Sequence, residues 1–109
     1  MKLVITKETA VLAAPGPGAE AFLARCLAAA SRGDEDALFD LGVAYATGSH
    51  GLSGDMIEAH KWFNLAASKG HEEASCCRAD VADEMTAREI AEAQRRARQW
   101  LAADLRKVA

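Results

Sequence analysis

Small and large apolar residues recur at helical spacing along the middle of the chain, between Ala37 and Ala74. Two successive runs each place their apolar residues on one helical face: Ala37, Leu38, Leu41 and Tyr45, and then Ala59, Trp62, Phe63, Ala66 and Ala67. Glycines separate the two runs, and Gly70 follows the second. The pattern predicts helix, turn, helix, turn. A single pair of this kind cannot bury both of its apolar faces, so it requires similar neighbours on either side.

The chain contains an internal repeat that supplies such neighbours. The segments AASRGDEDA (29–37) and AASKGHEEA (66–74) match at an offset of 37 residues, with identities or close exchanges at nearly every place. Gly33 matches Gly70, for example, and Glu35 matches Glu72. A fixed period of this length is typical of α-helical repeat arrays. We therefore predict an all-α fold, an α-α superhelix or solenoid of about five antiparallel helices.

Helix-terminal signals place the first three helices. An apolar stripe predicts a helix over 19–32, with Gly33 as the left-handed residue at its end. Asp34 then serves as the N-cap of a helix over 35–47. Asp55 and Glu58 have the spacing of a capping box, which starts a third helix over 56–69.

The last two helices are predicted by the same signals but depart from the repeat. In the fourth, over 72–84, the strict offset places Arg78 at the position that corresponds to Leu41. A different face of this helix is better suited to burial, the one with Ala74, Cys77, Val81 and Met85. Thr86 and Glu89 form a capping box for the last helix, over 87–107. Its stripe contains Ile90, Ala93, Ala97, Trp100 or Leu101, and Leu105. The polar face opposite that stripe is typical of a unit that closes a solenoid.

These residues resemble the Sel-one-like repeats, relatives of the tetratricopeptide repeats, and in particular small bacterial members. The family pattern is met by Ala37, Leu41, Gly42, Tyr45, Gly48, Gly51, Asp55, Ala59, Trp62, Ala66, Ala67, Gly70 and Ala74. One departure is the loop, where two residues separate Gly48 from Gly51 and the family has one. The breaker at Pro15 to Gly18 separates a partly flexible N-terminal arm (1–18) from the repeat domain (19–107). That domain would hold a half repeat (19–33), a full repeat (34–70) and a degenerate capping repeat (71–107).

Composition narrows the classes of function. The 109 residues suit one domain, and the net charge of −3, with both signs mixed, favours neither nucleic acid nor an anionic membrane as partner. The three cysteines are an odd number, and two of them are adjacent, so a disulfide framework is not expected. A reducing compartment, and hence a cytoplasmic location, is favoured.

The N-terminal segment suggests no targeting function. Residues 1–6 favour an extended piece, and Pro15 to Gly18 break the chain before the first helix. Lys7 and Glu8 interrupt the apolar run, so we interpret the segment as mature sequence rather than a signal peptide. The sequence has no apolar run near the twenty residues that a transmembrane helix requires.

The sequence shows no catalytic arrangement, and we expect neither an enzyme nor a cofactor. His71, Cys76 and Cys77 are the residues that a metal or an enzymatic domain would use, since imidazole and thiolate suit zinc. Adjacent helical residues point about 100° apart, however, and no fourth ligand is evident. The loop GSHGLSG lacks both the preceding strand and the Lys-Ser or Lys-Thr pair of a phosphate loop.

The surface is the remaining candidate for function. Opposite the buried face of the second helix lie Asp36, Phe39, Asp40 and Val43, which the offset maps onto Glu73, Cys76, Cys77 and Asp80. The predicted partner-binding residues are Asp36, Phe39, Asp40, Val43, Cys76 and Asp80. They would form an apolar groove with an acidic rim, suited to a basic or amphipathic protein segment.

Two interpretations of this surface remain open. In the first, the chain is a non-catalytic adaptor that binds a protein or peptide on its concave face, as the resemblance implies for proteins in signalling or cell-envelope processes. In the second, Phe39 packs against the N-terminal arm or against another subunit, and the protein is a structural homodimer.

Overall fold

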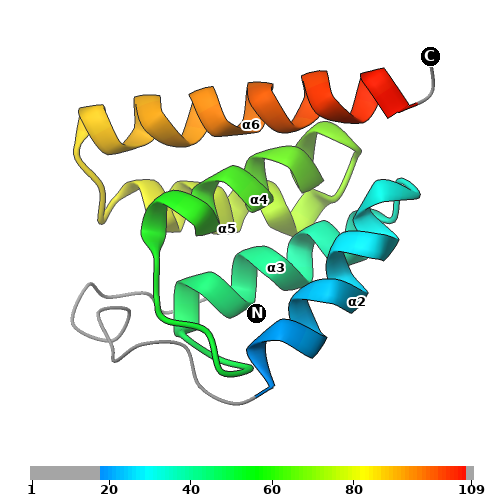
Figure 1. Cartoon of the computed structure of the whole chain (residues 1–109). Helices are drawn as coiled ribbons and strands as arrows, with labels where there is room; N and C mark the ends of the chain where they lie inside the picture. Colours follow the sequence, from blue (N-terminus) through cyan, green and yellow to red (C-terminus); the bar gives the residue numbers. More distant parts are fainter. Residues whose placement is uncertain (1–17, 108–109) are drawn as a thin grey trace.

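A computed structural model describes residues 18–107, and five helices make up most of this part of the chain: α2 (Ala19–Ser31), α3 (Glu35–Thr47), α4 (Met56–Ser68), α5 (Glu72–Ala82) and α6 (Ala87–Lys107). The described residues are thus all-helical, as predicted. Figure 1 shows α4 between α3 and α6, with α5 behind it and α2 at the lower right. Helix α4 packs against α3, α5 and α6, and α2 packs against α3.

The helix starts lie where the sequence predicts them, and α3, α4, α5 and α6 each begin with a side-chain cap. The Asp34 carboxylate accepts hydrogen bonds from the backbone N–H groups of Asp36 and Ala37, at 3.0 and 3.4 Å. Such bonds satisfy donors that the first turn of a helix leaves unpaired. Asp55 caps α4 in the same way through the N–H of Glu58, at 3.1 Å. The Glu58 side chain does not complete the expected box and instead accepts from Trp62 Nε1 at 3.2 Å.

The start of α6 carries the complete capping box. Thr86 Oγ1 accepts from the Glu89 N–H at 3.1 Å, and Glu89 Oε1 accepts from the Thr86 N–H at 2.8 Å. The reciprocal pair fixes the start of the helix at Ala87, as predicted.

Three helices end earlier than predicted, which corrects the expected bounds. Helix α2 ends at Ser31, α4 at Ser68 and α5 at Ala82, one residue short in the first two cases and two in the last. At the end of α5, Glu84 N–H donates to Val81 O at 2.9 Å and Met85 N–H to Ala82 O at 3.0 Å. These i to i+3 bonds tighten the last turn out of α-helical geometry.

The turns after α2 and α4 repeat the same geometry at the offset of 37 residues. Asp34 N–H donates to Ala29 O at 3.1 Å, and His71 N–H donates to Ala66 O at the same distance. Gly33 and Gly70 both have positive φ, at 88° and 101°. His71 also takes the capping position of Asp34, because its Nδ1 accepts from the Ala74 N–H at 3.2 Å. The sequence repeat therefore corresponds to a repeat in backbone structure.

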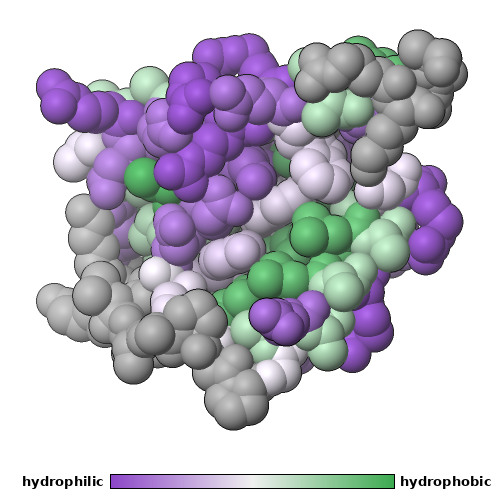
Figure 2. Space-filling model, in the orientation of Figure 1, coloured by the Kyte–Doolittle hydropathy of each residue, from purple (hydrophilic) through white to green (hydrophobic). Residues whose placement is uncertain are grey.

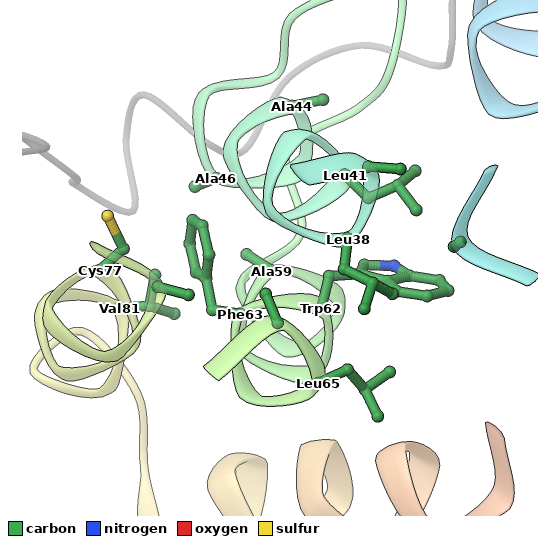
Figure 3. Packing of buried hydrophobic residues seen from close by; sticks show 14 of the residues in the cluster. Leu38, Leu41, Ala44, Ala46, Ala59, Trp62, Phe63, Leu65, Cys77 and Val81 are labelled. Atoms are coloured by element: carbon green, nitrogen blue, oxygen red, sulfur yellow. The ribbon is translucent and has the colours of Figure 1, made fainter. Parts of the chain in front are cut away.

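The core lies around α4 (Figure 3). The Phe63 ring is fully buried, and it approaches α3 so closely that a Cβ atom at Gly42 would lie 2.5 Å from its Cδ1. Trp62 lies beside Leu38 of α3 in Figure 3. The small residues that line both helices allow this approach, since ridges of one helix pack into grooves of the other.

The buried face of α5 is the one that the sequence favours over the strict repeat. Ala74, Cys77 and Val81 are buried, and Met85 packs against the same cluster. Arg78 is displaced from the core, and its guanidinium donates to Asn64 Oδ1 at 2.7 Å.

Helix α6 buries only part of its predicted stripe. Ala93 and Ala97 are buried, and Trp100 meets Trp62 edge to face at a centroid distance of 5.0 Å. The stripe thus continues through Trp100 rather than Leu101. Leu105 was expected to be buried, but it is 69% exposed because α6 extends past the end of α4 (Figure 1).

The predicted arm (1–18) and its extended piece lie outside the described residues, except for Gly18. None of the helices in the described part of the chain is long and apolar enough to cross a membrane.

Candidate functional site

A groove with a volume of about 500 Å³ runs along the outer side of α3, with α2 as one wall and α5 as the other. Its lining residues are Phe22, Arg25 and Cys26 from α2, Phe39, Asp40, Val43 and Ala44 from α3, His50 from the following loop, and Glu73 and Cys77 from α5. The exposed lining is mostly apolar. We call this hollow the α3 groove.

Stacked rings fix Phe39, which forms much of the floor of the groove. Its ring lies against the His71 imidazole, with centroids 4.3 Å apart and planes within 13° of parallel. On the other side it meets Phe63 at 5.6 Å. Phe39 is half-buried and contacts both rings, so its side chain is already positioned by the fold.

A second stacked pair closes one end of the groove. The His50 imidazole lies on the Phe22 ring at a centroid distance of 4.1 Å, with the planes 8° apart. The loop brings His50 there by taking positive φ at three places, 70° at Gly48, 57° at His50 and 81° at Gly51. His50 thus adopts a left-handed backbone conformation that residues other than glycine rarely take.

Carboxylates give the groove an acidic rim. Burial raises the pKa of Asp40, and the neighbouring charges of Asp36 and Asp34 raise it further. Glu73 adds a carboxylate on the α5 side, and Arg25 is the cation among the lining residues. A raised carboxyl pKa indicates that a further positive charge near Asp40 would be favourable, because that charge would stabilise the ionised form.

The environment of the two thiols in the groove disfavours the thiolate. Burial raises the pKa of Cys26, and the Asp40 charge adds to the effect. Burial raises the pKa of Cys77 as well, together with the charges of Asp80 and Glu73. The thiolate is the reactive and metal-binding form, so these shifts act against both kinds of chemistry.

The structure brings together some of the predicted partner-binding residues. Phe39, Asp40 and Val43 line the groove side by side. Asp36 lies at its edge, with a carboxylate oxygen 3.4 Å from His71 Nε2. Cys76 is exposed and Asp80 is half-buried, and neither belongs to the lining, where α5 contributes the neighbouring Glu73 and Cys77 instead.

The contribution of α2 was not predicted. Phe22, Arg25 and Cys26 form one wall of the groove, whereas the sequence assigns Phe22 and Cys26 only to the apolar stripe of a first helix. The offset maps these three residues onto Ala59, Trp62 and Phe63 of α4, but the wall itself follows only from the packing of α2 on α3.

The metal hypothesis gains no support from the geometry. His71 uses Nδ1 to cap α5, and its ring is stacked on Phe39. Among residues 18–107, no three His, Cys, Asp or Glu side chains are grouped so that they would hold a metal ion.

Outside the groove, apolar residues also gather over α2 on the face shown in Figure 2, whereas the start of α6 at the upper left is hydrophilic. A second hollow at the start of α2 is lined in part by Leu23, Tyr45 and Leu52. It has no ring stack like those of the α3 groove among the contacts described, and we regard it as the weaker candidate.

Comparison with protein-family models, curated proteins and solved structures finds no match to this chain.

Proposed function

We propose that this protein is a non-catalytic interaction module that binds an apolar segment of a protein partner in the α3 groove. The observation that supports this proposal is the mostly apolar groove, where Phe39 is stacked on His71 and meets Phe63 at a tilt, beside Val43. Partly exposed aromatic residues in a concave surface are typical anchors of protein interfaces.

The rim favours a partner with basic residues beside its apolar anchors. Asp40 and Glu73 line the groove, and Asp36 lies at its edge, so carboxylates outnumber the single guanidinium of Arg25. Charge complementarity of this kind speeds association and selects among partners more than it adds affinity.

A binding role accounts for the groove better than catalysis does. The nucleophiles available in it are the thiols of Cys26 and Cys77, and both have raised pKa values. A catalytic cysteine requires the opposite shift.

The fold that we propose for the module is a short Sel-one-like array. The capping geometry that recurs at Asp34 and His71 supports it, as does the match of the two Ala-Ala-Ser segments. Arrays of this kind bind partners through surfaces formed by several successive repeats.

The test uses a pull-down from the native host's lysate, read by mass spectrometry, with a Phe39→Asp, Val43→Asp double variant. The matched control is Leu101→Asp, Leu105→Asp, which places the same two charges on exposed apolar positions of α6. Both variants must first show a cooperative thermal unfolding transition. We expect one or more proteins to be retained by the natural chain and by the control, and lost with the groove variant.

Two outcomes would contradict the proposal. Partners that the groove variant retains would place the interaction elsewhere. A chain that retains no partner and forms dimers at micromolar concentration, with dimerisation abolished by the groove variant, would favour the structural homodimer instead.

A further inference from the structure

Helix α2 has the sequence position of the second helix in a repeat whose first helix is not among the described residues. The offset of 37 residues maps α2 onto α4, since Ala29 to Gly33 match Ala66 to Gly70. In the complete pair, α4 is preceded by α3, and the two helices pack face to face. For α2 the described residues contain no corresponding partner, because α2 begins at Ala19.

The residues of α4 that contact its own first helix are known. Phe63 fills the space over Gly42 of α3 and also meets Phe39. In Figure 3, Ala59 and Trp62 likewise lie between α4 and α3. These three positions of α4 are therefore among those through which a second helix contacts the first helix of its repeat.

The corresponding positions of α2 are the ones that line the α3 groove. Ala59, Trp62 and Phe63 map onto Phe22, Arg25 and Cys26, and these are the three α2 residues in the lining. The α2 side of the groove thus lies where the repeat would place a helix, and α5 forms the opposite wall. We infer that its occupant is a single amphipathic helix of a protein partner, which completes the half repeat; this inference rests on the proposed binding function.

The differences between corresponding residues of α4 and α2 indicate which side chains the bound partner helix needs. Cys26 is much smaller than Phe63, so the occupant needs a bulky apolar residue where α3 has Gly42. The carboxylates of Asp40 and Glu73 favour lysine or arginine on the flanks of that apolar stripe. An amphipathic helix laid into an apolar groove is an established way in which proteins recognise peptides.

The volume of the groove fits one such helix face. About 500 Å³ accommodates the side chains of a few anchor residues, within the usual range for a binding pocket. The polar face of the helix would remain in solvent, and the lysines beside the apolar stripe would lie near the acidic rim.

The probe is an 18-residue, N-acetylated and C-amidated peptide with leucines at positions i, i+3, i+4 and i+7, lysines on the flanks and alanines elsewhere. A second peptide has the same composition with the leucines scrambled out of helical spacing. A third replaces each lysine with glutamate. Binding is measured by fluorescence anisotropy, the site by amide chemical shifts of the full chain, and helicity by circular dichroism of the mixture.

We expect the lysine peptide to gain helicity on binding and to shift the amides of Phe22, Cys26 and Val43. The scrambled and the glutamate peptides should bind at least tenfold more weakly. The Asp40→Lys, Glu73→Lys double variant should bind the lysine peptide more weakly by a similar factor. The matched control is Asp83→Lys with Glu72→Lys, which makes the same charge change at exposed positions outside the groove and should leave binding within twofold.

Other results would overturn the inference without overturning the binding function. A scrambled peptide that binds equally well, or a bound peptide with no added helicity, would show that the groove takes an extended segment. No binding by any peptide, while the pull-down still depends on Phe39 and Val43, would exclude a simple amphipathic helix. Changes in the amide chemical shifts of groove residues that grow with protein concentration in the absence of peptide would assign the groove to a second copy of the chain.

Discussion

His60 is an ionisable side chain held inside the packed part of the fold. It is 4% exposed, and its Nδ1 has no hydrogen-bond partner among residues 18–107. Burial lowers the pKa of its imidazole, and the nearby charge of Arg78 on α5 lowers it further. The neutral ring is thus the form that the folded protein accepts, since a second positive charge there would be neither solvated nor paired.

This burial predicts a loss of stability in mild acid. The unfolded chain binds the His60 proton more readily than the folded chain, so the free energy of unfolding is fully retained above pH 6.5. It falls as the pH drops below 6.5 towards the lowered pKa of the folded state, by at most about 1.4 kcal/mol per pH unit. Urea unfolding between pH 7.5 and about pH 5 measures this slope.

The His60→Leu variant should flatten that slope, and it should be no less stable than the natural chain at pH 7 because it also removes an unpaired buried nitrogen. An equal slope in the natural chain and in His60→Leu would show that another group titrates on unfolding.

At the scale of single elements, α6 is attached to the fold mainly through α4. Trp100 lies edge-on to Trp62 at 5.0 Å, and Arg96 pairs with Glu58 across the two helices at 2.8 Å. On α6 itself, hydrogen bonds from Arg95 and Arg96 lower the pKa of Glu92 to about 2. The ionic contacts are partly exposed and screened by solvent, so the aromatic contact should contribute more to the attachment.

We therefore expect Trp100→Ala to cost about 1–3 kcal/mol of unfolding free energy, less than the 3–5 kcal/mol typical of a fully buried tryptophan because Trp100 is half-buried. Arg96→Gln should cost less than about 1 kcal/mol. Urea unfolding gives both values, and hydrogen exchange should show protection lost first in α6. A larger loss for Arg96→Gln than for Trp100→Ala would mean that the ion pair, rather than the ring contact, attaches the helix.

The sequence predicts the starts of these elements better than their ends or their partners. Asp34, Asp55 and Thr86 cap helices through bonds to residues two or three positions away, so a local motif is enough to locate them. The end of α5 depends on i to i+3 backbone hydrogen bonds that no sequence motif predicts. Likewise, α3 reveals Phe39 and Val43 as groove residues, but the wall formed by Phe22 and Cys26 follows only from the packing of α2 on α3.

At the scale of the whole molecule, overall dimensions do not distinguish a repeat array from an ordinary helical globule. The radius of gyration is 13.1 Å, close to the ~13 Å expected of a compact chain of this length. A stack of two and a half repeats is too short to show the curvature and elongation of a longer array. The distinction must come from energetics, because repeats in an array stabilise their neighbours through each new interface.

An added helix tests this difference. Residues 1–17 would be replaced by a second copy of residues 34–54, so that a copy of α3 and its loop precede α2 at the offset of 37 residues. In a repeat array the copy should pack on Phe22 and Cys26, and the thermal midpoint should rise by about 4–8 °C for each kcal/mol that the new interface contributes. The lysine peptide should then lose its site in the α3 groove.

The matched control carries the same insertion with serine in the copied positions of Leu38 and Leu41, which removes the apolar face while keeping chain length and loop. If the fold is a closed globule, both chains should unfold at the same temperature, because α2 would offer no surface that a preceding helix completes. A higher midpoint confined to the apolar copy would show that this end of the molecule accepts a further repeat helix. Since Phe22 and Cys26 line the α3 groove, the result would connect the repeat in the sequence directly to the proposed binding surface.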